Sequence, residues 1–135
     1  MEAYHTKASP LAGTSGTEIR KKAEVIMRIE RARTKRQPYV RSSYFSNSKV
    51  FIQPFWQHLW QKNWRDRNRR AKLLPCALEL LRRNNIEPKT TQNPNNPKEL
   101  LHRFAGVTPG GERFIVQVSE SKRTNRKNFM SVFPE

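Results

Sequence analysis

Alternating apolar and polar residues dominate the last third of the chain. Three segments show this pattern and are separated by glycine, proline or polar clusters: LLHRFAGVTPGG, ERFIVQVSESKRTNRK and NFMSVFP. Because successive side chains of a strand point to opposite faces, these segments predict a hairpin meander of three strands over residues 100–135.

The alternation also assigns side chains to faces of the predicted sheet. In the middle strand, one set is expected to face the core and the other set the opposite side: Phe114, Val116 and Val118 against Ile115, Gln117 and Ser119. In the last strand two registers stay open, with either of two sets in the core: Met130 and Val132, or Phe129, Ser131 and Phe133.

Upstream of the meander, apolar residues recur at helical spacing. The segment that begins at Thr17 predicts an amphipathic helix, whose basic face is either solvated or in contact with nucleic acid. Residues 39–52 predict a short hairpin or two extended arms around a polar turn. The segment CALELLRRNN, which follows Pro75, predicts another short helix with its leucines in the core.

One long helix is expected from Pro54 to about Lys72, because proline suits the first helical turn and no breaker follows before Pro75. The large apolar side chains fall in one arc, which more often forms core than a platform for stacked bases: Phe55, Trp56, Leu59, Trp60 and Trp64. Basic residues fall within about 40° of a line on another face. That line suits a phosphate backbone and consists of His58, Lys62, Arg65, Arg69 and Lys72.

These elements predict an α+β protein with N-terminal helices packed on a small C-terminal antiparallel β-sheet. Residues 1–16 are small and polar, and we expect a flexible tail there. Residues 17–135 are expected to form a single nuclease-like domain. Its helical part at 17–86 leads to the meander at 100–135 through a connector at 87–99, which is either a plain linker or a loop that clamps a substrate.

The chain is strongly basic, with 27 Lys and Arg against 11 Asp and Glu and a formal net charge of +16. Such an excess favours a polyanionic partner, with nucleic acid as the first candidate. A membrane partner is not expected, because the sequence has no run of about 18 apolar residues. The N-terminal residues also lack the pattern of a secretory signal, so we expect a cytoplasmic protein.

No metal site and no cofactor are expected. The three histidines and the single cysteine show no ligand spacing, and the acidic residues do not cluster. Cys76 lies among apolar neighbours and is interpreted as a small buried hydrophobe rather than a nucleophile.

Two parts of the chain carry a family pattern: FWQHLWQKNWRDRNRRAKLLPCALELLR, and HRFAGVTPGGERFIVQVSESKR followed by RKNFMSVFP. Together they resemble the phage and mobile-element nucleases of the barnase, EndoU, colicin and RelE-like superfamily, over roughly residues 38–134. The resemblance implies a helix packed on a small antiparallel sheet and cleavage of RNA without a metal. It further implies a toxin or mobile-element effector, with RNA as substrate and an antitoxin or immunity protein as a partner.

The resemblance also implies which residues carry the site: His58, Lys62 and Arg65 on the helix, and His102, Arg103, Lys127 and Ser131 near the sheet. His102 or His58 is expected to transfer protons. Arg103 and Lys127 are expected to contact the phosphate, and Ser131 to orient it. The residues expected to bind nucleic acid are Lys62, Arg65, Arg69, Lys72, Lys122 and Arg126. The histidine pair with a glutamate found in barnase is missing, because the glutamates near the meander, Glu112 and Glu120, fall at turns.

Metal-free cleavage of RNA needs a base for the ribose 2′-hydroxyl, a cation or donor for the phosphorane, and an acid for the 5′-oxygen. Histidine can fill either proton-transfer role, because its reference pKa is about 6.5. Two functions therefore stay open at this point. The first is a metal-independent endoribonuclease, and the second is a non-catalytic basic nucleic-acid-binding module of a phage or mobile element.

Overall fold

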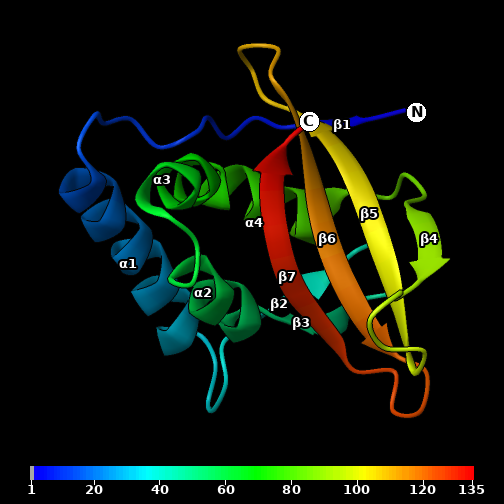
Figure 1. Ribbon diagram of the computed structural model, residues 1–135. Helices are drawn as coiled ribbons and strands as arrows, with labels where there is room; N and C mark the ends of the chain where they lie inside the picture. Colours follow the sequence, from blue (N-terminus) through cyan, green and yellow to red (C-terminus); the bar gives the residue numbers. More distant parts are fainter. Residues whose placement is uncertain (1) are drawn as a thin grey trace.

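A curved sheet and four helices make up the fold of residues 2–135, the part of the chain that this computed structural model describes. The helices are α1 (Gly16–Ala32), α2 (Gln53–Leu59), α3 (Trp64–Lys72) and α4 (Leu74–Arg83). The strands are β1 (Tyr4–His5), β2 (Tyr39–Ser42), β3 (Ser48–Phe51), β4 (Lys89–Gln92), β5 (Glu99–Val107), β6 (Arg113–Ser121) and β7 (Lys127–Pro134). Figure 1 shows α1, α2 and α3 gathered on the β7 side of the strands β5 to β7.

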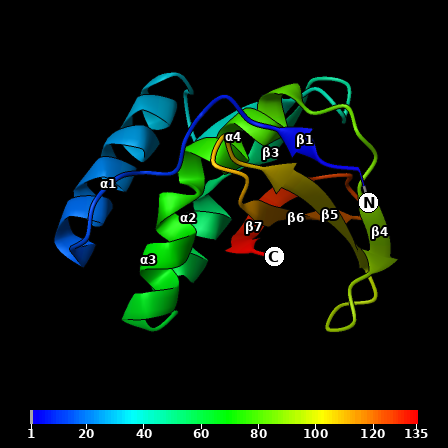
Figure 2. The ribbon, with the colours of Figure 1, turned by 90° about the horizontal axis from the view of Figure 1, so that it is seen from above.

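The sheet is mixed and draws strands from the whole chain. Its order is β1-β5-β6-β7-β3-β2, with β4 pairing along another part of β5. The pairs β1–β5 and β3–β7 are parallel and the remaining pairs are antiparallel. Figure 2 shows how far the sheet curls from β7 to β4.

The expectation of a small C-terminal antiparallel sheet is therefore wrong, although the α+β class itself holds. Of the two alternatives for residues 39–52, the hairpin is present, because β2 and β3 pair antiparallel there, and it joins the sheet through the pair β3–β7. The strands β1 and β4 lie in the segment expected to be a tail and in the connector at 87–99, and their two and four residues are too few for a clear alternation. Parallel pairs also join segments far apart in the sequence, without a hairpin turn to announce them.

The predicted meander forms the centre of this sheet as β5, β6 and β7, each antiparallel to the next. The alternation expected for the middle strand is confirmed, because Phe114, Val116 and Val118 are fully buried. Gln117, between two of them, is only half-buried and lies on the other face. One face of the three strands therefore belongs to the core and the other carries polar groups.

Neither register expected for the last strand is present. Phe129 and Val132 are both fully buried, although their spacing does not fit a regular strand. Phe129 pairs with Val118 while the neighbouring Gln117 pairs with Ser131, so Met130 is an extra residue in β7. This β-bulge shifts the alternation by one residue, which explains why apolar pattern alone could not assign the faces.

The long helix expected from Pro54 to Lys72 is also interrupted. α2 ends at Leu59, and α3 begins after Asn63, whose side-chain oxygen accepts a hydrogen bond from the Asp66 N–H at 3.0 Å. An asparagine at this position satisfies a free N–H group of the first turn and favours a new helix start. The basic residues expected along one line therefore do not share one helix.

Glu79 of α4 holds the N-terminal residues against the sheet. Its carboxylate accepts hydrogen bonds from the Tyr4 hydroxyl at 2.8 Å and from the Lys7 and Ala8 N–H groups at 2.8–3.1 Å. Within the segment 1–16, expected to be a flexible tail, the structure thus has the strand β1; Met1 lies outside the described residues. Burial opposes the charge of Glu79, but the hydrogen bonds outweigh burial and lower the pKa of this carboxyl. Burial and this hydrogen bond raise the pKa of Tyr4 to about 12.

Glu79→Gln is expected to lower the free energy of unfolding by about 2 kcal/mol near neutral pH, because a neutral amide oxygen accepts these hydrogen bonds less strongly. The pKa of Glu79 is lower in the folded state, so its contribution is complete above the unfolded value of about 4.3 and is lost as the pH falls through the folded value. Urea unfolding of both proteins at about pH 7 and pH 3 measures this difference. The exposed Glu87→Gln is the control. A difference that does not shrink in acid would contradict the assignment.

Candidate functional site

The helix α2 lies along the edge of β7 where β3 ends. β3 pairs with β7 through only two residues of each strand, and the chain then turns into α2, which packs against β7. Phe55 of α2 stacks on Phe129 of β7, with ring centroids 4.5 Å apart and ring planes inclined by 12°. Both rings are fully buried. His58 follows Phe55 by three residues and lies where α2 meets the polar face of the sheet.

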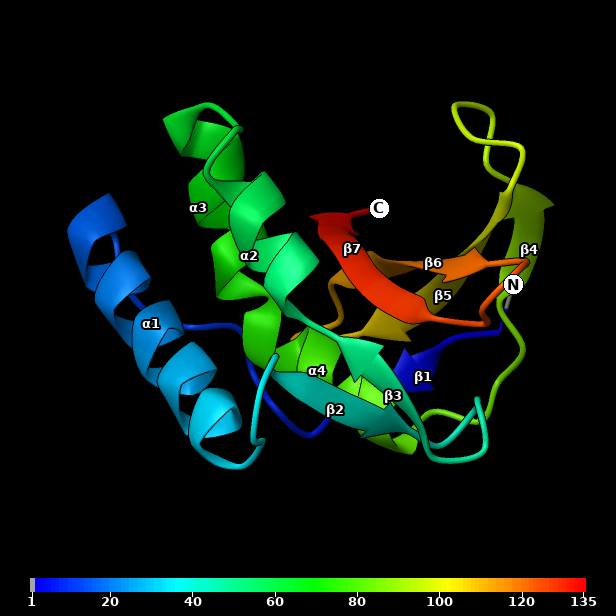
Figure 3. The same cartoon turned by 90° about the horizontal axis from the view of Figure 1, so that it is seen from below.

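A cleft of about 610 Å³ opens between this helical part and the polar face of β5, β6 and β7. Its floor consists of Leu101, Arg103, Gln117, Ser119, Met130, Ser131 and Phe133. One wall consists of His58, Gln61, Lys62 and Arg70, and the other of Asn93, Pro94 and Asn95 in the β4–β5 loop. Figure 3 shows the elements that carry these walls, with α2 and α3 on one side of β7 and the loop after β4 on the other.

Arg70 of α3 is fixed in the cleft by three contacts. One of its terminal nitrogens donates a hydrogen bond to the Ser131 hydroxyl. Its Nε lies 3.1 Å from Asp66 Oδ2, an ion pair without hydrogen-bond geometry. Its guanidinium also lies over the Phe133 ring, 5.4 Å from the centroid. The side chain therefore joins α3 to β7 and places a cation beside a hydroxyl.

Three other polar side chains of the cleft are more open. Arg103 is exposed, and its Nε donates a hydrogen bond of 3.2 Å to Gln117 Oε1 on the neighbouring strand. His58 is half-buried, and Lys62 is exposed in the turn after α2. With the residues from 2 to 135, neither His58 nor Lys62 makes a side-chain hydrogen bond or ion pair. Both side chains are therefore available to a ligand.

The lining of the cleft is positive. Lys62, Arg70 and Arg103 contribute three cations, and no carboxylate is among the described residues that line the cleft. Hydroxyl and amide groups from Ser119, Ser131 and Gln117 supply neutral donors and acceptors. A concave surface of this composition suits a phosphate group with polar substituents next to it.

His102 and Lys127 lie on the opposite, core face of the same strands. His102 Nδ1 is 2.8 Å from Thr90 Oγ1, and its Nε2 is 2.7 Å from Glu120 Oε1. Lys127 Nζ lies 3.3 Å from Glu120 Oε2. The His102 ring also contacts Phe45, with centroids 5.0 Å apart. His102 is 6% exposed and Lys127 8%, so both are enclosed by protein.

The structure thus brings together four of the residues that the sequence predicts for the site: His58, Lys62, Arg103 and Ser131. The other predicted residues do not line this cleft: His102, Lys127, Arg65, Arg69, Lys72, Lys122 and Arg126. His102 is kept apart from Arg103 because neighbouring strand positions face opposite sides, and Lys127 is kept apart from Ser131 because the bulge at Met130 shifts the alternation between them. Three of the remainder lie on α3 beyond the break in the helix, and Lys122 and Arg126 lie between β6 and β7.

Sequence reasoning missed Arg70, the cation with the most contacts in the cleft. Its spacing of four residues from Asp66 suggests an ordinary pair on a helix surface, and only the packing of α3 against β7 shows where it points. Gln117 and Ser119 could have been identified from the sequence, because strand alternation already places them on the polar face of the predicted sheet.

Within residues 2–135, no group of three or more His, Cys, Asp or Glu side chains is placed to hold a metal ion. Cys76 is fully buried, and its thiol lies 3.2 Å from the Ala8 carbonyl oxygen. Burial raises the pKa of the Cys76 thiol, which keeps it protonated and unreactive near neutral pH.

No protein-family model matches the chain, and no curated protein or solved structure shows significant similarity to it. No helix between residues 2 and 135 combines the length and apolar character needed to cross a membrane. Function is therefore inferred from the chemistry of the cleft.

His102→Ala is expected to lower the free energy of unfolding by about 2 kcal/mol, because Thr90 and Glu120 lose a partially buried hydrogen-bond partner. Urea denaturation measures the effect. The matched control is His5→Ala, which removes an exposed histidine and should leave stability unchanged. Unchanged stability of His102→Ala together with weaker nucleic-acid processing would show instead that this ring reaches a ligand.

Proposed function

We propose that the protein is a metal-independent endoribonuclease that cleaves RNA by attack of a ribose 2′-hydroxyl on the adjacent phosphate. The observation that carries this proposal is the convergence of His58, Arg70, Arg103 and Ser131 in one cleft, from four separate elements of the fold. The sequence resemblance to phage and mobile-element nucleases of the barnase, EndoU, colicin and RelE-like superfamily supports the same function.

Proton transfer falls to His58 and Lys62. The His58 imidazole accepts the proton of the 2′-hydroxyl, while a bond forms between the 2′-oxygen and phosphorus. The bond from phosphorus to the 5′-oxygen breaks, and the Lys62 ammonium protonates the departing oxygen. The products are a 2′,3′-cyclic phosphate and a new 5′-hydroxyl.

Arg70 and Arg103 stabilise the negative charge that develops on the phosphorane. Arg70 extends from the wall on α3 and Arg103 from the floor on β5, and their guanidinium groups can each bind phosphate oxygens in bidentate fashion. The Ser131 hydroxyl accepts a hydrogen bond from Arg70, so its own proton can be donated to the phosphate. Donors held in place before the reaction stabilise the charge that develops in the transition state.

The composition of the cleft favours this route over one that uses a divalent cation. Magnesium sites depend on carboxylates together with substrate phosphates. The described residues that line the cleft include three cations and no carboxylate, so the lining repels a divalent cation and offers it no carboxylate ligand.

A non-catalytic basic nucleic-acid-binding module is the second candidate. Its support is that the cleft contains only one of the three histidines, because His102 lies in the core and His5 lies on β1. In that case the same cations bind the phosphate backbone, and no strand is cut.

His58→Ala is expected to lower the rate of RNA cleavage by about 10²-fold or more, which is the usual loss when a general base is removed. The assay follows a fluorescent single-stranded RNA in EDTA on a denaturing gel, with mass spectrometry of the products. A cyclic phosphate end is expected, and RNA with a 2′-deoxy residue at the cleaved position should stay intact because it lacks the nucleophile.

His5→Ala is the matched control for this substitution and should cleave like the wild type. Cleavage by His58→Ala at the wild-type rate would exclude His58 as the base. RNA binding without any cleavage by the wild-type protein would favour the binding module.

Arg103→Gln is expected to lower kcat/KM by about 10²-fold with little effect on stability, because Arg103 is exposed and bonds only to Gln117 among residues 2–135. Single-turnover cleavage and thermal unfolding measure the two effects. The exposed Lys7→Gln removes the same charge at a position that does not line the cleft and serves as the control. An equal loss of kcat/KM in both variants would show that Arg103 acts only through the net charge of the protein.

A further inference from the structure

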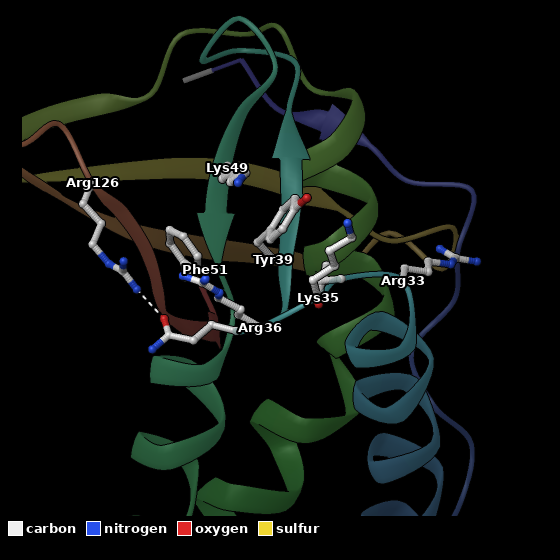
Figure 4. Close-up of a pocket in the computed structure, with 9 residues that line it drawn as sticks. Arg33, Lys35, Arg36, Tyr39, Lys49, Phe51 and Arg126 are labelled. Atoms are coloured by element: carbon white, nitrogen blue, oxygen red, sulfur yellow. Dashed lines mark hydrogen bonds between the residues drawn. The ribbon is translucent and has the colours of Figure 1, made fainter.

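A second basic surface lies between the end of α1, the β2–β3 hairpin and the turn before β7. It is a groove of about 810 Å³, and among the described residues it shares none of its lining with the cleft. Five cations line it, and no described carboxylate does: Arg33, Lys35, Arg36, Lys49 and Arg126. We call it the basic-aromatic groove. Figure 4 shows that Arg126 reaches toward Phe51 from one side while Lys35 and Arg36 approach from the other.

Two aromatic rings form the floor of the basic-aromatic groove. Tyr39 and Phe51 are cross-strand neighbours on β2 and β3, with ring centroids 6.0 Å apart, and both are half-buried. The Arg126 guanidinium lies 3.8 Å from the Phe51 centroid, and Lys49 Nζ lies 4.8 Å from the Tyr39 centroid. Both cations therefore lie over a ring, and sites for single-stranded nucleic acid stack bases on aromatic rings or on arginine guanidinium planes while nearby cations hold the phosphates.

The positive charge of the basic-aromatic groove is poorly compensated. Lys49 lies directly opposite Arg41 in the hairpin, and like charges at such positions destabilise a strand pair. Of the five cations, Arg33 pairs with Glu30 at 3.3 Å, whereas Lys35, Arg36 and Lys49 form no ion pair with a carboxylate among residues 2–135. Arg126 donates its hydrogen bond to the neutral Gln37 rather than to a carboxylate, as Figure 4 shows by the dashed line. An anionic ligand in this groove would therefore reduce the electrostatic repulsion among the lining cations.

One row of paired residues in the sheet links the basic-aromatic groove to the cleft. Phe51 pairs with Asn128, and Asn128 pairs with Ser119, which belongs to the floor of the cleft. Paired residues on neighbouring strands face the same side, and strands lie about 4.8 Å apart, so Phe51 and Ser119 are separated by about 10 Å. One extended strand of nucleic acid can therefore contact both places.

We propose that the basic-aromatic groove binds single-stranded RNA as a continuation of the strand held in the cleft, an inference that rests on the proposed function for the cleft. The two rings favour this ligand over an acidic protein, because cations alone would serve a carboxylate-rich surface. They also favour it over a duplex, whose bases are already stacked on one another.

The test compares Arg36→Gln/Lys49→Gln with the wild type in binding a fluorescent single-stranded oligonucleotide of about 12 nucleotides. The oligonucleotide carries 2′-O-methyl groups, so that binding is measured without cleavage. Affinity is expected to fall about tenfold, and the slope of log K against log salt to decrease by about 1.4, because two phosphate contacts are lost. A mononucleotide, too short to reach from Ser119 to Phe51, should bind both proteins equally.

The matched control is Lys7→Gln/Lys21→Gln, which removes the same net charge from exposed positions outside both surfaces. An equal loss of affinity in the control would overturn the inference, as would an equal loss for a duplex of the same length. Lys49→Gln should not lower the melting temperature of the free protein, since it removes the repulsion from Arg41. Photo-crosslinking of a 4-thiouridine oligonucleotide to the peptide that contains Phe51 would support the inference by an independent route.

Failure of this inference and failure of the proposed function give different results. If the wild type cleaves RNA but the groove variants bind the long oligonucleotide like the wild type, the inference is wrong and the nuclease stands. If the wild type cleaves no RNA but the groove variants still lose affinity for the long oligonucleotide alone, the nuclease is wrong and the single-strand surface stands.

Discussion

The stacking of Phe55 on Phe129 determines where the cleft of this protein lies. These fully buried rings join α2 to β7 just where β3 leaves the sheet, so a helix replaces a strand beside β7. Once the rings are in contact, the end of α2 has to meet the polar face of the sheet, and His58 is brought toward Ser131. A contact within the apolar core thus positions a histidine that has no hydrogen-bond partner of its own among the described residues.

The two faces of the sheet differ, because one packs in the core and the other lines the cleft. On one face of β5, Phe104 and His102 join the core, and on the other Arg103 opens into the cleft. The bulge at Met130 lets β7 keep this division, because it brings Val132 to the core after Phe129 and turns Ser131 outward. The bulge turns the Ser131 hydroxyl to the cleft face of the sheet, where Arg70 of α3 donates a hydrogen bond to it.

The sequence predicts the parts of this site more reliably than their assembly. Alternation identifies β6 and the polar face that carries Gln117, because a residue period of two needs only local geometry. It misses β1 and the bulge, since a two-residue strand and one inserted residue leave almost no periodic signal. The break at Asn63 is missed for a different reason: a basic run without proline looks continuous until a side-chain cap competes with the helix. The position of Arg70 depends on how the elements assemble, because its partner Ser131 lies 61 positions further along the chain.

Electrostatics connects the cleft with the basic-aromatic groove. The chain carries a formal net charge of +16, and both surfaces gather cations with no lining carboxylate among the described residues. Outside the two surfaces, Lys127 pairs with Glu120 and Arg82 with Glu30. On the two surfaces, Arg70 pairs with Asp66 and Arg33 shares Glu30 with Arg82, while the other lining cations form no ion pair with a carboxylate among the described residues. The negative charge of a bound polyanion would reduce the repulsion among the cations of these surfaces. Because such a ligand binds only the folded chain, it would also raise the free energy of unfolding by mass action.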